Sequence, residues 1–219
     1  MNRQHVTLLV ILDLSAAFDT VDHHIMLERL KSSFDIQDQV LKWFISYLSN
    51  RSQVISVNGG TSKRFELKNG VPQGSCFGPR LFVLYVSKLF QILESHLPDA
   101  HAFADDNQLY VSFQPDPMSG QLSAVTVMEN CIDDIKTWML NHKLKLNDDK
   151  TDFFIIGTRQ QLEKVNFDTL RIGDSYVTAS SEAKDLGFWL DSQMKCDTSV
   201  NSSSYFILMI ESLHQISPC

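Results

Sequence analysis

Residues 101–113 have the sequence HAFADDNQLYVSF, in which two short apolar segments flank an acidic pair. The segments 101–104 and 109–113 are typical of β-strands, and Asp105-Asp106 between them are typical of a tight turn. An antiparallel pair of strands is therefore expected here.

The flanking segments extend this pair to a complete sheet. TLLVILDL (7–14) is a dense apolar run, as expected of a strand covered on both faces, and a helix is predicted from Pro79 to about Ser95. A helix is also predicted over about 121–142, followed by a strand at FFIIG (153–157). This order of elements predicts an α+β fold, a split β-α-β (ferredoxin-like) sheet backed by helices.

Further elements are predicted as insertions after the first strand. Two amphipathic helices fit within residues 24–48, and a hairpin around Asn58-Gly59-Gly60 fits residues 53–67. A second hairpin is expected around Asp174-Ser175.

Composition excludes several classes of protein. The 219 residues are 43% hydrophobic, which argues against long disorder, and the four cysteines are scattered, which argues against a zinc site or a disulfide framework. The net charge is −7, with 10 basic and 12 acidic side chains in residues 1–120 and 9 and 14 in residues 121–219. Neither half is a basic arm, so composition argues weakly against a free-standing nucleic-acid-binding protein.

The N-terminal segment imitates a signal peptide, with Arg3 before an apolar run and Ser15-Ala16-Ala17 after it. Asp13 interrupts that run, and a buried strand accounts for it better. No apolar run approaches the ~18 residues of a membrane span. We therefore expect an intracellular protein, cytoplasmic or nuclear, that is neither secreted nor membrane-bound.

Two acidic positions, Asp13 and the pair Asp105-Asp106, are candidates for a metal-binding site. Asp13 ends an apolar strand, and the first and second strands of a split β-α-β sheet can lie side by side, which would bring Asp13 to Asp105 and Asp106. Converging carboxylates repel one another unless a cation lies between them, and hard oxygen ligands suit Mg²⁺. Two such ions can hold the attacking and leaving oxygens of a phosphoryl transfer. The alternative is that Asp-Asp is simply turn chemistry.

Three segments then become recognisable together: VILDLSAAFDTVDH (10–23), NGVPQGSCFGPRLF (69–82) and FADDNQLYVSF (103–113). In this order they resemble the reverse transcriptases of non-LTR (LINE-type) retrotransposons. LKLNDDKTDFFIIG (144–157) and KDLGFWLD (184–191) resemble the two segments that follow in that family. The resemblance covers most of residues 7–191.

The resemblance implies a polymerase palm and an RNA-directed DNA polymerase activity. Asp13, Asp105 and Asp106 would be the catalytic, metal-binding set for Mg²⁺ or Mn²⁺. Two-metal transfer of a deoxynucleotide to a primer 3′-hydroxyl would then require an RNA template, a DNA primer and deoxynucleoside triphosphates as partners.

Four more residues acquire roles through the resemblance. Phe18 would exclude the 2′-hydroxyl of ribonucleotides, unless it is only a core Phe. Gln73 and Gly74 would contact template and incoming nucleotide, although Pro-Gln-Gly alone would be a turn. Lys150 would lie near the leaving pyrophosphate, or it is a solvated lysine in a polar loop.

The chain also departs from the family pattern. Phe103 replaces a tyrosine, and Cys76, Phe77 and Arg80 replace residues that are usually small or aliphatic. We expect a truncated palm domain at residues 1–196 and a degenerate tail at 197–219 where a thumb would begin, with fingers, thumb and endonuclease domains missing. We expect no measurable primer extension by the isolated chain. The alternative is a catalytically inactive retroelement remnant, at most an interaction domain.

Overall fold

A computed structural model describes residues 5–72, 74–97, 101–103, 106–147, 150–180, 182–185 and 188–191. For residues 101–103, 106, 107, 182–185 and 188–191 it describes the backbone alone. The chain divides into two compact units. The first unit contains residues 1–13, 92–136 and 147–219, and the second contains residues 14–91 and 137–146.

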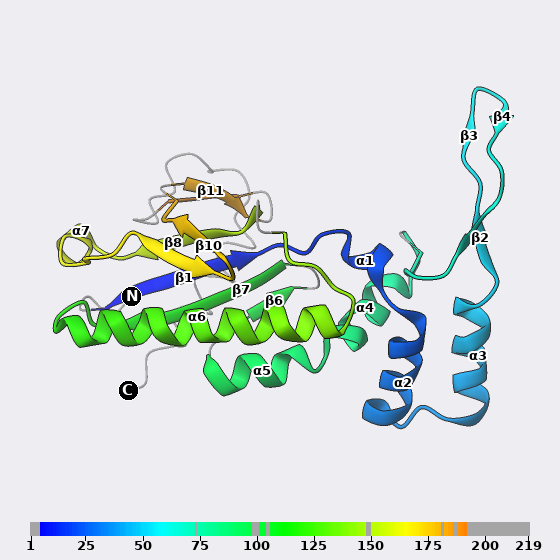
Figure 1. Cartoon of the computed structure of the whole chain (residues 1–219), viewed down its shortest axis with the longest axis horizontal. Coiled ribbons are helices and arrows are strands. Elements are labelled where there is room, and N and C mark those ends of the chain that lie inside the picture. The colour runs from blue at the N-terminus through cyan, green and yellow to red at the C-terminus, as the bar shows by residue number, and fades with distance from the viewer. Residues whose placement is uncertain are drawn as a thin grey trace. The chain divides into compact units, whose positions relative to one another are not determined.

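The first unit is built on a four-stranded antiparallel sheet in the order β6-β7-β1-β8 (Figure 1). The strands are β1 (Val6–Leu12), β6 (His101–Phe103), β7 (Asp106–Phe113) and β8 (Asp152–Ile156). This order confirms the split β-α-β topology. The predicted neighbour of β1 was wrong, however, because β1 pairs with β7 and not with β6. After β6 the chain reverses direction, and β7 lies between β6 and β1. β7 is therefore the neighbour of β1, and β6 is at the edge of the sheet.

The core of this unit lies on both faces of β1. All seven residues of β1 are buried, as its continuous apolar sequence predicts. On one face Leu9 and Ile11 cluster with Tyr110, Phe154 and Ile156. Each fully buried side chain of this size contributes about 1.5–3 kcal/mol to the stability of the fold. The packing of these side chains therefore holds β1 in place up to its last residue.

Helix α6 (Met118–Asn141) runs along the sheet in Figure 1. The hairpin of β9 (Thr169–Ile172) and β10 (Ser175–Thr178) is fastened to this helix by Arg171, whose guanidinium donates to both carboxylate oxygens of Asp133 at 3.1 and 2.7 Å. This hydrogen bonding raises the pKa of Arg171 above its ordinary value. The unit also contains α7 (Arg159–Leu162), β11 (Glu182–Asp185) and β12 (Phe188–Asp191).

The helix predicted from Pro79 to Ser95 is two helices. These are α4 (Gly78–Val86) and α5 (Leu89–His96). At the break the Ser87 N–H donates to Leu84 O, three residues back and at 3.4 Å, so the regular ladder of bonds to the fourth residue back stops there. The His96 Nε2 atom of α5 lies 2.8 Å from Asp134 Oδ2 of α6.

The second unit contains α4 and the elements predicted as insertions. They are α1 (Ala17–Thr20), α2 (His23–Phe34), α3 (Asp38–Leu48), β2 (Arg51–Gln53), β3 (Ser56–Val57), β4 (Gly60–Thr61) and β5 (Phe65–Leu67). β2 pairs with β5 and β3 with β4, which confirms the hairpin around Asn58-Gly59. Asp22 caps α2 by accepting from the His24 and Ile25 N–H groups.

Two expectations from the sequence concern the whole chain. Within the described ranges, no helix has the length and apolar character needed to cross a bilayer. The predicted boundary at residue 197 lies outside the described residues.

Candidate active site

Asp13 directly follows β1 at one end of the sheet, and its carboxylate is held in place. Asn147 Nδ2 donates to Asp13 Oδ2 at 2.9 Å, and the Asn147 backbone N–H donates to the Asp13 carbonyl at 2.9 Å. The Asp13 side chain is 25% exposed. A carboxylate at this position is oriented by its neighbour and remains accessible to a ligand.

Asp106 is the first residue of β7 and lies at the same end of the sheet. The last pair between β1 and β7 is Leu12 with Asn107, so the positions of Asp13 and Asp106 come next on the two strands. Residues that face each other in antiparallel strands have Cα atoms about 4.5–5.5 Å apart. The backbone therefore brings these two positions together. Asp105 lies outside the described residues, so its separation from Asp13 stays a prediction.

Lys150 also reaches this end of the sheet. Its Nζ atom lies 3.7 Å from Asp13 Oδ2, and its side chain is 71% exposed. The Lys150 N–H and the Thr151 hydroxyl both donate to the Asn147 carbonyl, at 3.1 and 3.0 Å, which holds Asn147 and Lys150 close together beside Asp13. An ion pair this exposed adds at most about 1 kcal/mol of stability, so its importance is as a movable positive charge beside the carboxylate.

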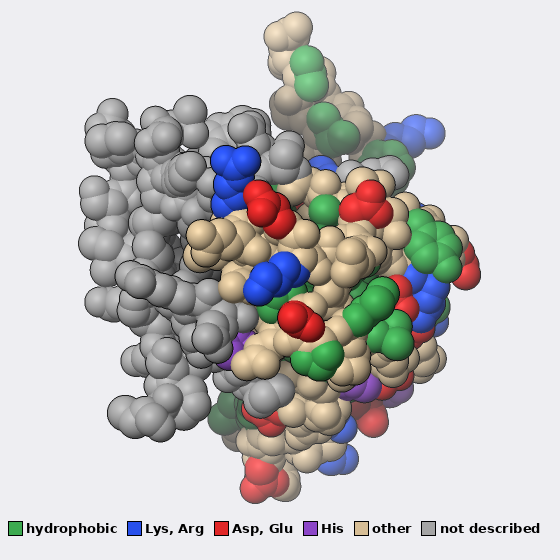
Figure 2. Space-filling view, turned by 90° about the vertical axis from the view of Figure 1, so that its left-hand side faces the viewer, with side chains coloured by type: hydrophobic (Ala, Val, Ile, Leu, Met, Phe, Trp, Pro, Cys, Tyr) green, Lys and Arg blue, Asp and Glu red, His purple; other side chains and the backbone are tan. Residues whose placement is uncertain are grey.

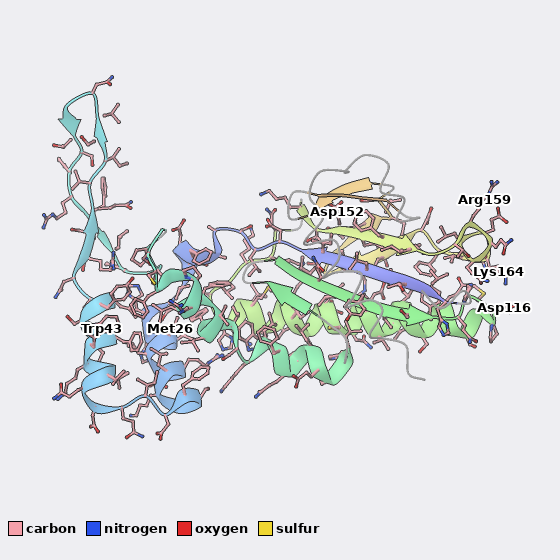
Figure 3. The ribbon with its side chains drawn as sticks, turned by 180° about the vertical axis from the view of Figure 1, so that it is seen from behind. Met26, Trp43, Asp116, Asp152, Arg159 and Lys164 are labelled. Atoms are coloured by element: carbon pink, nitrogen blue, oxygen red, sulfur yellow. The ribbon has the colours of Figure 1, made fainter. Side chains whose placement is uncertain are left out.

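A further carboxylate lies on β8 at the same end of the sheet. Asp152 is paired with Ile11 of β1, two residues before Asp13, and accepts a hydrogen bond from Ser180 Oγ at 2.8 Å. Figure 3 shows Asp152 near this end of the sheet and Asp116, in the loop after β7, at the other end. The two carboxylates therefore mark opposite ends of the same sheet.

The donor set fits a divalent cation in part. Asp13 offers a hard carboxylate oxygen, and both of its partners within the described residues contact Oδ2. Those residues contain no group of three His, Cys, Asp or Glu side chains that could hold a metal ion. The remaining ligands that the sequence predicts, Asp105 and the Asp106 side chain, are outside that description.

The predicted nucleotide-contacting residues belong to the second unit. The Phe18 ring is half-buried and packs against buried Phe82, with ring centroids 5.1 Å apart. Gly74 is exposed and has φ +74°, a conformation that favours glycine, while Gln73 lies outside the described residues. The packing of Phe18 satisfies the core interpretation and leaves its role in sugar selection a prediction.

Two backbone hydrogen bonds join the segment that contains Phe18 to residues 70 and 71. The Val71 N–H donates to Phe18 O and the Gly70 N–H to Val21 O, each at 2.8 Å. Gly70 has φ +86°, and a Cβ atom placed on it would be 3.0 Å from Asp19 O. The residues that precede Pro72 are thus joined to the segment that carries Phe18.

Sequence reasoning missed Asn147. From the sequence alone, Asn147 had no role beyond its place in the segment 144–157, yet its side chain and backbone both donate hydrogen bonds to Asp13. The feature of the sequence that could have indicated a role for Asn147 is its position three residues before Lys150, in the segment 144–157. The contact of Asn147 with Asp13 becomes evident only when the two segments are seen side by side in the structure.

The comparison with protein families decides the classification. Residues 1–190 match the family model described as reverse transcriptase (RNA-dependent DNA polymerase). The chain belongs to the reverse transcriptase family. The match includes both segments that meet at Asp13 and Asn147, as well as Lys150.

Individual reverse transcriptase relatives agree with this assignment. The chain is 26% identical over 194 residues to a probable RNA-directed DNA polymerase from transposon BS of Drosophila melanogaster, covering 84% of this chain and 20% of the relative. It is 33% identical over 107 residues to a Pol polyprotein from the type-1 retrotransposable element R2 of Popillia japonica, covering 44% of this chain and 18% of the relative. The chain therefore spans about a fifth of the length of these relatives.

A solved structure shares the fold. The apo telomerase of Candida tropicalis superposes with a TM-score of 0.58 over 95% of this chain and 36% of that chain, at 12% identity. At this identity the likeness concerns the fold alone, and it agrees with the palm-like sheet of the first unit.

Proposed function

We propose that this chain is the palm domain of an RNA-directed DNA polymerase, formed by residues 1–196. The observation that carries the proposal is the juxtaposition of Asp13, after β1, with the position of Asp106, at the start of β7, in a reverse transcriptase family chain. The reaction would join the primer 3′-oxygen to the α-phosphorus of a deoxynucleoside triphosphate and release pyrophosphate.

Asp13, Asp105 and Asp106 would hold Mg²⁺ or Mn²⁺. When bound, such ions polarise the 3′-hydroxyl and neutralise charge on the transferred phosphate. Asn147 holds the Asp13 carboxylate in one orientation through the 2.9 Å hydrogen bond to Oδ2. Asn147 is therefore a positioning residue, which acts through Asp13.

Lys150 would serve the leaving group. Its exposed Nζ atom, 3.7 Å from Asp13 Oδ2, is free to turn toward a triphosphate that binds at the carboxylates. A cation there would stabilise the charge on departing pyrophosphate or supply a proton to it.

Three residues would select the substrates. Phe18 would exclude a 2′-hydroxyl, while Gln73 and Gly74 would contact the template and the incoming nucleotide. Gly74 is suited to close approach because it has φ +74° and a Cβ atom there would meet nothing within 4 Å. An RNA template and a DNA primer would then be the partners.

Metal binding tests this function most sharply in the 219-residue chain, because it needs only the site and not sustained synthesis. Free Mn²⁺ is measured by electron paramagnetic resonance during titration, with and without a deoxynucleoside triphosphate. We expect the triphosphate to tighten Mn²⁺ binding, because its phosphates complete the coordination. We expect Asp13→Asn to weaken that binding at least tenfold.

Asp116→Asn is the matched control, because it removes a carboxylate from the opposite end of the same sheet (Figure 3). It should bind Mn²⁺ as the wild type does. Equal binding by wild type and Asp13→Asn would refute the metal site and favour the inactive remnant.

A further inference from the structure

Basic side chains are concentrated in one segment of this acidic chain. Residues 42–80 contain six basic side chains and one acidic side chain, a net charge of +5 within a chain of −7. The basic residues are Lys42, Arg51, Lys63, Arg64, Lys68 and Arg80, and the acidic one is Glu66.

The same segment carries an exposed aromatic cluster. The Trp43 ring stacks on Tyr47 at 5.4 Å between centroids and lies 5.3 Å from the Phe77 ring. Trp43 is 46% exposed and Phe77 is 40% exposed. Rings that packed only to fill a core would be covered, so this cluster has surface available for a partner.

Arg51 joins the aromatic cluster to the hairpin. Its guanidinium carbon lies 5.4 Å from the Tyr47 ring centroid, and its Nη1 atom donates to Tyr47 O at 3.3 Å. Arg51 is also the first residue of β2 and pairs with Leu67 of β5. A cation is therefore held over the Tyr47 ring, where the hairpin begins.

The hairpin extends this surface. Figures 1 and 3 show it projecting from the end of α3, with Trp43 near its base. Lys63, Arg64 and Lys68 lie exposed on its returning side, between and beyond β4 and β5. We call α3 from Lys42 onward, the hairpin to Lys68, and residues 77–80 the basic arm.

This combination of features favours one class of ligand. Cations beside exposed aromatic rings bind single-stranded nucleic acid, because phosphates pair with the cations and unpaired bases stack on the rings. An apolar protein partner would account for exposed Val57 and Phe65, but not for six basic residues against one acidic residue. On the face shown in Figure 2, by contrast, described Lys and Arg side chains are mixed with Asp and Glu side chains.

We propose that the basic arm binds a single strand of RNA, with bases stacked on Trp43 and Phe77 and phosphates contacted by Arg51, Lys63 and Arg64. The choice of RNA rests on the proposed function, in which the template is RNA. Phe77 and Arg80, which depart from the usual pattern of the family, then have a use on this surface.

The test is fluorescence anisotropy of a labelled single-stranded RNA with the 219-residue protein at several salt concentrations. Lys63→Glu with Arg64→Glu should weaken binding at least tenfold. Loss of two phosphate contacts should also reduce the slope of log Kd against log salt by about 1.4, at about 0.7 per contact on a single strand. Both side chains are exposed, so folding should be unaffected.

Trp43→Ala should weaken binding by roughly 5- to 150-fold, the range for loss of one stacked base, and leave the salt slope unchanged. The matched control is Arg159→Glu with Lys164→Glu, which makes the same change in charge at two exposed positions in and after α7 (Figure 3). It should alter the affinity less than threefold.

Four results would overturn the proposal. They are wild-type affinity in the basic-arm variants, an equal loss in the α7 control, tighter binding of DNA than of RNA through the same residues, and a dimer that the basic-arm variants dissociate. Failure of the arm is distinguished from failure of the metal site, because RNA binding and Mn²⁺ binding are measured in separate titrations.

Discussion

At the scale of the residue, the Asp13 carboxylate is contacted by two side chains, those of Asn147 and Lys150. The family resemblance implied that Lys150 lies near the site of Asp13, with a solvated lysine as the alternative, and Lys150 Nζ lies 3.7 Å from Asp13 Oδ2. The structure adds Asn147, which donates to the same oxygen. Opposite effects are expected from removing these two neighbours, because one orients the carboxylate and the other competes for it.

Removal of the Asn147 side chain should weaken metal binding. In Asn147→Ala the backbone hydrogen bond to Asp13 O can persist, but the donor that orients Oδ2 is lost. Loss of a group that orients a metal ligand typically costs 10- to 100-fold in affinity, and about tenfold is expected here in Mn²⁺ titration. Asn166→Ala, whose amide donates to Lys164 O elsewhere in the same unit, should bind Mn²⁺ normally. Equal affinities for wild type and Asn147→Ala would show that Asp13 needs no support.

Removal of the Lys150 charge should have the opposite sign when no triphosphate is present. Lys150→Gln removes a cation that competes with the metal for Asp13, so Mn²⁺ affinity should rise by up to about fivefold, the range of an exposed ion pair. The gain in affinity on adding a triphosphate should shrink, because Lys150 no longer attracts its phosphates. If Lys150→Gln behaves as the wild type in both titrations, Lys150 is only a solvated lysine in a polar loop and has no role at the site.

At the scale of the element, local patterns predicted most strands and turns and the sheet topology, but not the strand that pairs with β1. The Asn58-Gly59-Gly60 sequence predicted a turn because glycine accepts positive φ, and Gly59 has a positive φ, as does Gly70 after Asn69. The apolar run of β1 predicted a strand covered on both faces. The partner of β1 was predicted wrongly, and the helix after Pro79 was expected to continue through Ser87. The pairing of β1 depends on contacts between residues distant in sequence, which no local pattern contains.

The two turns differ in what surrounds them, which makes a matched pair of variants. Gly70→Ala should lower the free energy of unfolding by about 1 kcal/mol for the positive φ, and by a further 1–3 kcal/mol because its Cβ would be 3.0 Å from Asp19 O. Gly59→Ala has a similar φ but nothing within 4 Å, so about 1 kcal/mol or less is expected. Urea unfolding followed by circular dichroism compares them. Equal losses would mean that the approach to Asp19 is not tight.

At the scale of the whole molecule, buried polar groups make stability depend on pH. In the second unit, Tyr85 donates its hydroxyl proton to His142 O, and the Tyr85 carbonyl accepts from Arg29 Nη1 at 3.1 Å. Burial lowers the pKa of His142 below 6.5, and the nearby charges of Arg29 and Lys88 lower it further. The folded chain therefore holds this imidazole neutral at pH values where the unfolded chain protonates it.

This shift predicts a loss of stability in acid. As pH falls through 6.5, the unfolded state takes up a proton at His142 that the folded state resists, so unfolding is favoured. The melting temperature of the wild type should fall more steeply between pH 7.5 and 5.5 than that of His142→Gln, which lacks the titrating group. Parallel melting curves across that range would contradict the depressed pKa of His142.

The proposed divalent cation binds where the positions of Asp13 and Asp106 come together, at the end of β1 and the start of β7. Fe²⁺ can replace Mg²⁺ and, with ascorbate and peroxide, cut the backbone near its binding site, and mass spectrometry locates the cuts. We predict cuts near residues 13, 106 and 147 that excess Mg²⁺ suppresses and Asp13→Asn abolishes. Cuts confined to other segments, or cuts near residue 13 that persist in Asp13→Asn, would contradict the account.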